Sequence, residues 1–169
     1  MCKGRTVEIN KSEVLREAIR FRKLIQSCDP ENTALVASSF PIMSCKLTSM
    51  ILVYHFLQLY AEAEIKGIGG VRPDNGSISH YWIEIEGFAV DITGDQYNLI
   101  DDDELDEVLV ALRPFSPIHV AELEDSFLYD IFDVSYVDIF TEGLPDVSES
   151  FIERLVLSYS QLTAIETYT

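Results

Sequence analysis

The sequence predicts an α+β domain in which helices pack against a small antiparallel sheet. Three observations predict this class. Apolar residues recur at helical spacing in residues 12–27, an almost wholly apolar segment follows Pro41, and residues 80–93 alternate with a period of two. Helices followed in sequence by antiparallel strands are typical of α+β domains. The 169 residues contain no repeat, low-complexity tract or Ser/Gly linker, so we expect a single domain, 1–169.

The first predicted helix covers residues 12–27 and forms an N-terminal part, residues 1–30. Ser12 is its expected N-cap, and Asp29-Pro30 ends it.

The second predicted helix begins near Ser44 and extends to about Glu64. Pro41 precedes it, Ser44 is suited to cap it, and its residues are apolar almost all round. A helix of this composition is expected at the centre of a fold.

The middle of the chain changes to an extended pattern. Residues 65–72 are interrupted by glycines and indicate an extended segment, which ends in a turn at residues 73–76. Residues 80–85 and 88–93 both alternate, and Glu86-Gly87 between them fits a two-residue hairpin loop.

Residues 101–169 form an acidic C-terminal part with a weaker pattern. Residues 105–112 are apolar enough for a helix or a strand, and residues 127–140 indicate a strand or a loop. Residues 151–165 predict a closing amphipathic helix. The acidic run 101–107 lacks the glycine and glutamate of a calcium-binding EF-hand loop. It predicts a solvated loop or the negative first turn of a helix.

Alternation divides the predicted hairpin into two faces. The core face is apolar and comprises Tyr81, Ile83, Ile85, Phe88, Val90 and Ile92. The opposite, non-core face comprises His80, Trp82, Glu84, Ala89, Asp91 and Thr93. On this face His80 is diagonal to Asp91, at a backbone separation of about 7–8 Å. Asp91 is then placed to accept a hydrogen bond from one ring nitrogen of His80, which leaves the other nitrogen free to act as a base.

Cys45 is the candidate nucleophile for this base. It falls at the first position of the second predicted helix, directly after Ser44. The positive end of the helix dipole favours a thiolate there, and the free backbone N–H groups favour an oxyanion beside the sulfur.

Taken singly, each of these residues has a structural interpretation. A cysteine at a helix start is usually a packing or surface residue, a strand histidine is usually structural, and Asp91 alone could be a solvated carboxylate. Their combination on one face favours a catalytic triad or its inactive relic.

The same residues resemble the papain-like and transglutaminase-like thiol enzymes. The resemblance lies in Cys45 opening a central helix, in the segment His80-Tyr81-Trp82-Ile83-Glu84-Ile85, and in Val90-Asp91-Ile92-Thr93, within residues 35–97. It implies a fold in which the helix carrying Cys45 packs on a small antiparallel sheet carrying His80 and Asp91. Residues 44–97 would be the catalytic core, with Cys45 as nucleophile, His80 as general base and acid, and Asp91 as the orienting carboxylate.

The oxyanion donor departs from the pattern of this superfamily. Papain-type peptidases place a glutamine a few residues before the cysteine, where this chain has Ser38, Ser39 and Phe40. Gln96, five residues after Asp91, is the nearest side-chain candidate. Trp82 is a second candidate contact to the substrate, or a shield for the His80–Asp91 pair.

Composition limits the partners. Residues 1–24 carry seven basic and three acidic residues, whereas residues 25–169 carry five basic and 26 acidic ones. A net charge of −17 disfavours nucleic acids and anionic membranes as partners. The N-terminus has no apolar stretch typical of a signal peptide, and three cysteines suggest free thiols, so we expect a cytoplasmic protein. His55 and His119 have no neighbour at metal-ligand spacing, and we expect neither a metal nor another cofactor.

Two functions are compatible with these patterns. The first is a cysteine-dependent acyl-transfer enzyme acting through a thioester on an amide of a protein or peptide, as a glutamine deamidase, transglutaminase or peptidase. The alternative is an acidic binding or inhibitor protein, comparable to an immunity protein, that docks to a basic protein and uses the same fold without catalysis.

Overall fold

The computed structural model describes residues 9–140 and 144–168 and has the α+β class that the sequence predicts. Its helices are α1 (Lys11–Ser27), α2 (Cys45–Leu59), α3 (Glu107–Ala111), α4 (Leu128–Ile131) and α5 (Glu149–Ala164). Its strands are β1 (Ile65–Arg72), β2 (Asn75–Ile85), β3 (Phe88–Asp91), β4 (His119–Glu122) and β5 (Asp133–Ile139). Neighbouring strands are antiparallel and lie in the order β4-β3-β2-β1-β5.

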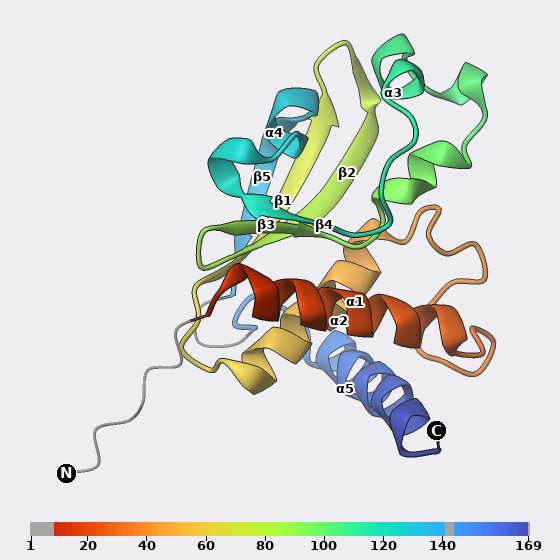
Figure 1. Cartoon of the computed structure of the whole chain (residues 1–169). Helices are drawn as coiled ribbons and strands as arrows, with labels where there is room; N and C mark the ends of the chain where they lie inside the picture. Colours follow the sequence, from red (N-terminus) through yellow and green to blue (C-terminus); the bar gives the residue numbers. More distant parts are fainter. Residues whose placement is uncertain (1–8, 141–143, 169) are drawn as a thin grey trace.

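The sheet lies between two clusters of apolar side chains. Helices α1, α2 and α5 cover one face (Figure 1), where the larger cluster joins them to Tyr81 and Ile83 of β2. On the other face, Leu109 of α3 and Leu128 of α4 belong to a smaller cluster around Trp82. The prediction of a non-core face was therefore wrong. The segments after β3 fold back over it, and an alternating strand pattern contains no information about such long-range coverage.

Helix α1 is capped by Asn10 and not by Ser12, as the sequence analysis expected. Asn10 Oδ1 accepts from the Glu13 N–H at 3.0 Å, and the Glu13 carboxylate accepts from the Asn10 N–H at 3.3 Å. This reciprocal pair is a capping box, which a lone serine at position 12 does not provide. The helix ends at Ser27, as predicted.

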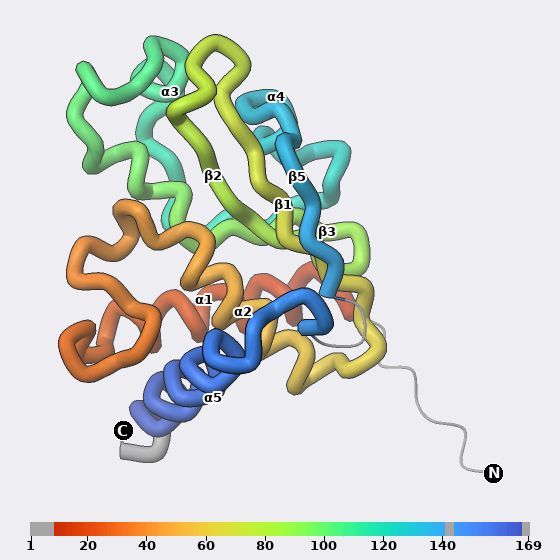
Figure 2. The backbone as a smooth tube through the Cα atoms, turned by 180° about the vertical axis from the view of Figure 1, so that it is seen from behind, coloured from red at the N-terminus to blue at the C-terminus, as the bar shows by residue number. Residues whose placement is uncertain are grey.

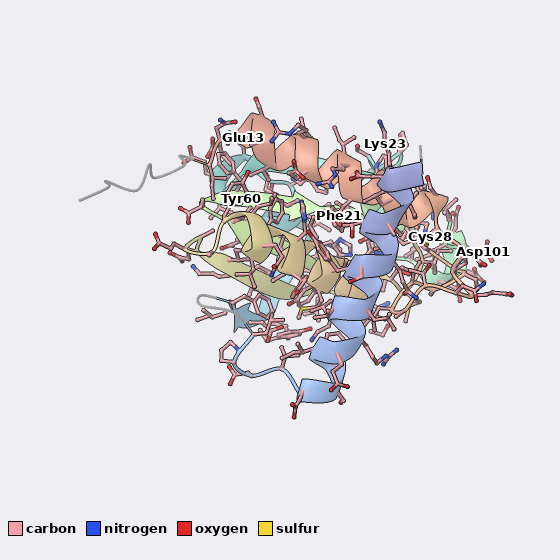
Figure 3. All side chains as sticks on the ribbon, turned by 90° about the horizontal axis from the view of Figure 1, so that it is seen from below. Glu13, Phe21, Lys23, Cys28, Tyr60 and Asp101 are labelled. Carbon is pink, nitrogen blue, oxygen red and sulfur yellow. The ribbon has the colours of Figure 1, made fainter. Side chains whose placement is uncertain are left out.

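Helix α2 is the buried helix that its composition predicts, although it ends at Leu59 and not near Glu64. Its histidine, His55, is a core residue: Nε2 lies 2.7 Å from Glu17 Oε2, and Nδ1 lies 3.1 Å from the Tyr159 hydroxyl oxygen. Figure 3 shows α5 lying across α1 and α2, and the Phe21 ring of α1 packs 4.2 Å from the His55 ring. These contacts fix α2 between the other two helices and the sheet.

The predicted hairpin forms with the predicted register. The paired residues are Ile85 and Phe88, Glu84 and Ala89, and Ile83 and Val90. Glu86 and Gly87 form the loop with φ of 48° and 85°. Positive φ at both positions is what a two-residue type I′ loop requires, so the loop sets the register of the strands that carry the site.

The glycine-rich segment 65–72 is a full strand between β2 and β5. The side chains of Tyr81 and Tyr136 occupy the space that a Cβ at Gly67 or Gly69 would need. The glycines therefore allow large side chains from both neighbouring strands to lie over β1.

The C-terminal part combines the alternatives that the sequence left open. Residues 105–112 contain the short helix α3, and a 3-10 turn at Asp102–Glu104 takes the place of a first helical turn. Residues 127–140 divide into α4 and the strand β5. The closing helix α5 begins two residues before the predicted start, because the Ser148 hydroxyl accepts from the Phe151 N–H.

Cys28 and Cys45 are free thiols, and Cys2 lies outside the described residues. Within the described ranges, no helix has both the length and the apolar character needed to cross a membrane.

We predict that Gly87→Ala lowers the free energy of unfolding by about 1–2 kcal/mol, because an L side chain is disfavoured at positive φ. A Cβ there would meet no atom within 4 Å, so the loss would come from the backbone. Gly76→Ala is the matched control, with equally open surroundings and no positive φ, and should change stability by less than about 0.5 kcal/mol. Urea unfolding measures both variants, and equal effects would contradict the type I′ loop.

Candidate active site

The three residues of the predicted triad come together where α2 meets the sheet. Cys45 is the first residue of α2, His80 lies in β2, and Asp91 ends β3. His80 Nε2 lies 2.8 Å from Asp91 Oδ2, and both side chains are completely buried. The diagonal relation inferred from the alternating strands is therefore a direct hydrogen bond.

The Asp91 carboxylate is fully engaged. Its other oxygen, Oδ1, accepts from the Thr93 N–H at 2.9 Å and from the Thr93 hydroxyl at 3.1 Å. Burial would raise the pKa of Asp91, but the charge of His80 and the hydrogen bonds from His80 and Thr93 lower it. Asp91 is therefore held as a carboxylate and fixes the orientation of the histidine ring.

The thiol and the imidazole are coupled. Burial of the Cys45 thiol would raise its pKa, but a hydrogen bond with His80, the charge of that ring and the Tyr81 backbone N–H together lower it. Burial of His80 opposes its protonation, yet the charge and hydrogen bond of Asp91, together with Cys45, raise the pKa of His80 to about 10. The two directions favour a thiolate–imidazolium pair.

Gln96 lies at the same ring. It belongs to the 3-10 turn Gly94–Asn98, it is buried, and its Nε2 lies 3.1 Å from His80 Nδ1. Because Nε2 of His80 is used by Asp91, Nδ1 is the nitrogen that remains for Cys45 and Gln96. In the neutral ring this nitrogen accepts a hydrogen bond from the Gln96 amide.

Aromatic side chains enclose the imidazole. Trp82 and Phe132 stack on it with centroid distances of 6.2 and 5.5 Å, and Tyr97 meets it edge-on at 5.4 Å. Trp82 is fully buried, and its indole N–H donates to the Tyr129 hydroxyl at 3.3 Å. Trp82 thus shields the His80–Asp91 pair and is not exposed to a substrate. Sequence reasoning missed Tyr97 and Phe132, since neither lies in the hairpin.

The start of α2 leaves backbone donors free beside the thiol. Ser44 is at the N-cap position, as predicted, but its hydroxyl donates to the Ile42 carbonyl and does not cap the helix. The first helical N–H to bond within the turn is that of Thr48, to the Ser44 carbonyl. Among the described residues, no group accepts from the N–H groups of Cys45, Lys46 and Leu47.

Arg22 of α1 ties together the segments that carry these residues. Its Nη1 donates to the Ile92 carbonyl at 2.6 Å, and its Nη1 and Nη2 bind the two Asp95 oxygens at 2.8 and 2.7 Å. Its guanidinium also lies 4.5 Å from the centre of the Phe40 ring, in the loop that leads to Cys45. Ile92 follows Asp91, and Asp95 precedes Gln96. One buried guanidinium therefore contacts all three segments.

Sequence reasoning missed Arg22, although its position in the predicted helix indicates that it is buried. Arg22 lies four residues after Ala18 and three before Ile25, so it falls on the apolar side of the predicted helix. An arginine on a core-facing side indicates a buried ion pair. The neighbouring Arg20, by contrast, pairs with Glu166 at the protein surface.

Neither His55 nor His119 joins the site. His55 is in the helical core, and His119 Nε2 bonds to the Ser126 hydroxyl at 2.9 Å. Over residues 9–140 and 144–168, no group of three or more histidine, cysteine, aspartate or glutamate side chains is arranged to hold a metal ion.

We predict that Asp95→Asn, which weakens the Arg22 contact, raises the pH midpoint of Cys45 alkylation as well as lowering stability by about 1–3 kcal/mol. The charge-assisted pair positions Asp91 and Gln96, so loosening it should weaken the coupling of His80 to the thiol. Arg22→Lys, which keeps the positive charge, should raise the alkylation midpoint by a smaller amount. Iodoacetamide alkylation against pH and urea unfolding measure the two effects.

Glu64→Gln is the matched control, because Glu64 pairs with Lys66 of β1 at an exposed position and contacts none of these segments. It should leave the alkylation midpoint unchanged. If folded Asp95→Asn loses stability but keeps the wild-type midpoint, Arg22 is structural and does not position the site.

Comparison of the chain with models of protein families, with curated proteins and with solved structures found no match. The chemistry of the site is therefore inferred from its own geometry.

Proposed function

We propose that the protein is a cysteine-dependent acyl-transfer enzyme acting on an amide of a protein or peptide. The observation that carries the proposal is the buried 2.8 Å contact between His80 and Asp91, coupled to a half-buried thiol at the first residue of a helix. A buried, oriented imidazole beside a thiol of lowered pKa is the arrangement that nucleophilic catalysis requires. The resemblance of these segments to papain-like and transglutaminase-like enzymes agrees with it.

The reaction follows from the positions of the groups. The Cys45 thiolate attacks the amide carbonyl carbon, a carbon–sulfur bond forms, and the carbonyl oxygen becomes an oxyanion. The carbon–nitrogen bond then breaks as His80 gives the Nδ1 proton to the leaving nitrogen. Water or an amine next attacks the thioester and gives a proton to His80, and the thiolate leaves. Peptidase, glutamine deamidase and transglutaminase share these steps and differ in the amide bound and in the second nucleophile.

Two sets of donors would stabilise the oxyanion. The unpaired N–H groups at the start of α2 lie beside the sulfur, where the helix dipole is positive. The Gln96 amide is the second. When the thiol proton moves to His80 Nδ1, this nitrogen no longer accepts from Gln96, and the amide becomes free to donate to the oxyanion.

We predict that Cys45 is alkylated by iodoacetamide with a pH midpoint below that of an ordinary thiol, about 8.5. His80→Gln should raise the midpoint, because the neutral amide cannot supply the positive charge that stabilises the thiolate. The alkylation rate should stay high above the midpoint, since only the thiolate is needed. Release of p-nitroaniline from a peptide p-nitroanilide should instead fall again above pH 10, because the leaving nitrogen needs the proton that His80 then loses.

Circular dichroism of His80→Gln controls for folding. A midpoint near 8.5 that is unaffected by His80→Gln contradicts the enzyme proposal, and it favours the acidic binding protein that the charge of −17 also suggests.

We predict that Gln96→Ala slows acyl transfer by Cys45 without raising the pKa of its thiol. Loss of the Gln96 amide removes a donor that favours the neutral ring, so the alkylation midpoint should fall or stay unchanged. Thioester formation with p-nitrophenyl acetate should slow about 10²-fold, because alkylation forms no oxyanion whereas acyl transfer does. Single-turnover release of nitrophenol measures the second rate. Equal slowing of both reactions would assign Gln96 a positioning role and not an oxyanion contact.

A further inference from the structure

Strand β5 is an edge strand of the sheet with exposed apolar side chains. Within residues 9–140 and 144–168 its one partner strand is β1, and Figure 2 shows it along the outer side of the sheet. Val134, Tyr136, Val137 and Ile139 are 45–59% exposed. The opposite edge strand, β4, has four residues, of which one is buried and one is exposed. Natural proteins usually shorten, charge or cover sheet edges. β5 carries Asp133 and Asp138, but it has seven residues and exposes four large apolar side chains, which indicates a binding surface.

The unpaired backbone groups of β5 can be assigned from its register. The Phe140 N–H donates to the Ile65 carbonyl of β1. In an antiparallel pair, successive residues alternate between bonding to the partner and pointing away from it. Asp138 therefore bonds toward β1 like Phe140, and Val137 and Ile139 direct their N–H and C=O groups outward. These groups are placed to pair with an added strand.

A pocket of about 540 Å³ adjoins the end of this edge. It lies between residues 137–140, the first turns of α2 and the start of α5, and its apolar lining includes Leu47, Met50 and Phe151. A strand added to β5 would turn alternate side chains toward this pocket. Strand addition gives affinity through the backbone, and such pockets give specificity.

The charges around this surface favour a basic partner. Asp138 and Asp146 line the pocket, and Asp133 lies at the other end of β5. Lys46, the cation of the lining, is already engaged: its Nζ lies 3.8 Å from Asp138 and over the rings of Tyr81 and Tyr136. Two copies of the chain, each with a net charge of −17, would repel one another at this edge.

We propose that β5 and the adjoining pocket bind an extended basic segment of the protein substrate as a sixth strand. The pocket would receive one apolar side chain of this segment, and neighbouring lysines or arginines would meet Asp133, Asp138 and Asp146. Lys46 directly follows Cys45, so a chain docked here is held beside the helix turn that carries the thiol. This inference rests on the proposed function, because it takes the bound segment to belong to a substrate, but binding of the segment does not itself require the thiol.

The test uses the full chain with Cys45→Ala and a synthetic acetylated peptide of alternating lysine and valine. The peptide should slow hydrogen–deuterium exchange of residues 133–139, and its affinity, measured by fluorescence anisotropy, should fall as salt rises. A peptide with glutamate in place of lysine should not bind. Absence of protection at roughly 1 mM lysine peptide would overturn the proposal.

Val137→Pro removes an outward N–H without removing a bond to β1, and a proline is tolerated on an edge strand. It should weaken peptide binding at least about tenfold, whereas Val137→Thr, which keeps the N–H, should bind like the parent chain. Asp146→Lys should weaken binding about tenfold more than Glu153→Lys, which changes the charge equally outside the pocket. Equal binding by the two Val137 variants would overturn strand addition.

Two further measurements separate the outcomes. If the chain alone sediments as a dimer that Val137→Pro dissociates, the edge belongs to a second copy and the proposal fails. Val137→Pro with Cys45 intact should keep the wild-type alkylation profile. Failure of docking is thereby distinguished from failure of the thiol chemistry, which Cys45 alkylation tests by itself.

Discussion

The contacts of Arg22 are the constraint on which the arrangement of the site depends. The helix α1 is remote in sequence from the triad, yet its buried guanidinium binds the Ile92 carbonyl, the Asp95 carboxylate and the face of Phe40. A buried cation is costly unless all its donors are satisfied. The three partner segments are therefore held in one relative position, because a shift in any of them would leave a buried charge without its partner.

The buried His80–Asp91 pair is a second pair of buried charges, each of which is costly without its partner. Aromatic rings of Trp82, Tyr97 and Phe132 exclude water from it, which strengthens its electrostatic attraction and raises the penalty for breaking it. The negative charge of Asp91 by itself raises the pKa of the Cys45 thiol, but it also raises the pKa of His80, and the protonated ring beside the sulfur lowers the thiol pKa. The aromatic rings and the ionic pair therefore act together. Without Asp91, burial by the rings would favour the neutral form of His80. Without the rings, water would weaken the attraction between His80 and Asp91.

The local sequence pattern was sufficient to predict the hairpin, but it was insufficient to predict the segments that pack around the hairpin. The loop Glu86-Gly87 and strict alternation determine which residues face each other, so the approach of His80 to Asp91 could be predicted from short-range information. The cap of α1 was misassigned because Ser12 and Asn10 are both suited to cap a helix, and the reciprocal bond with Glu13 decided between them. Coverage of the second sheet face, Phe132 and the Arg22 contacts depend on segments far apart in the chain. No periodicity encodes those contacts.

The start of α2 connects the two surfaces of functional interest. Successive residues of a helix point about 100° apart around its axis. Cys45 and Lys46 consequently diverge: the thiol meets His80 and the Tyr81 N–H, whereas the Lys46 ammonium crosses the Tyr81 ring to Tyr136 and Asp138 of β5. Tyr81 lies between them, and its hydroxyl donates to Asp138 at 2.9 Å. Such an arrangement is possible because Gly67 and Gly69 leave room above β1. The glycines that interrupt the sequence of β1 thus allow both the thiol of Cys45 and the exposed edge strand β5 to lie next to the start of α2.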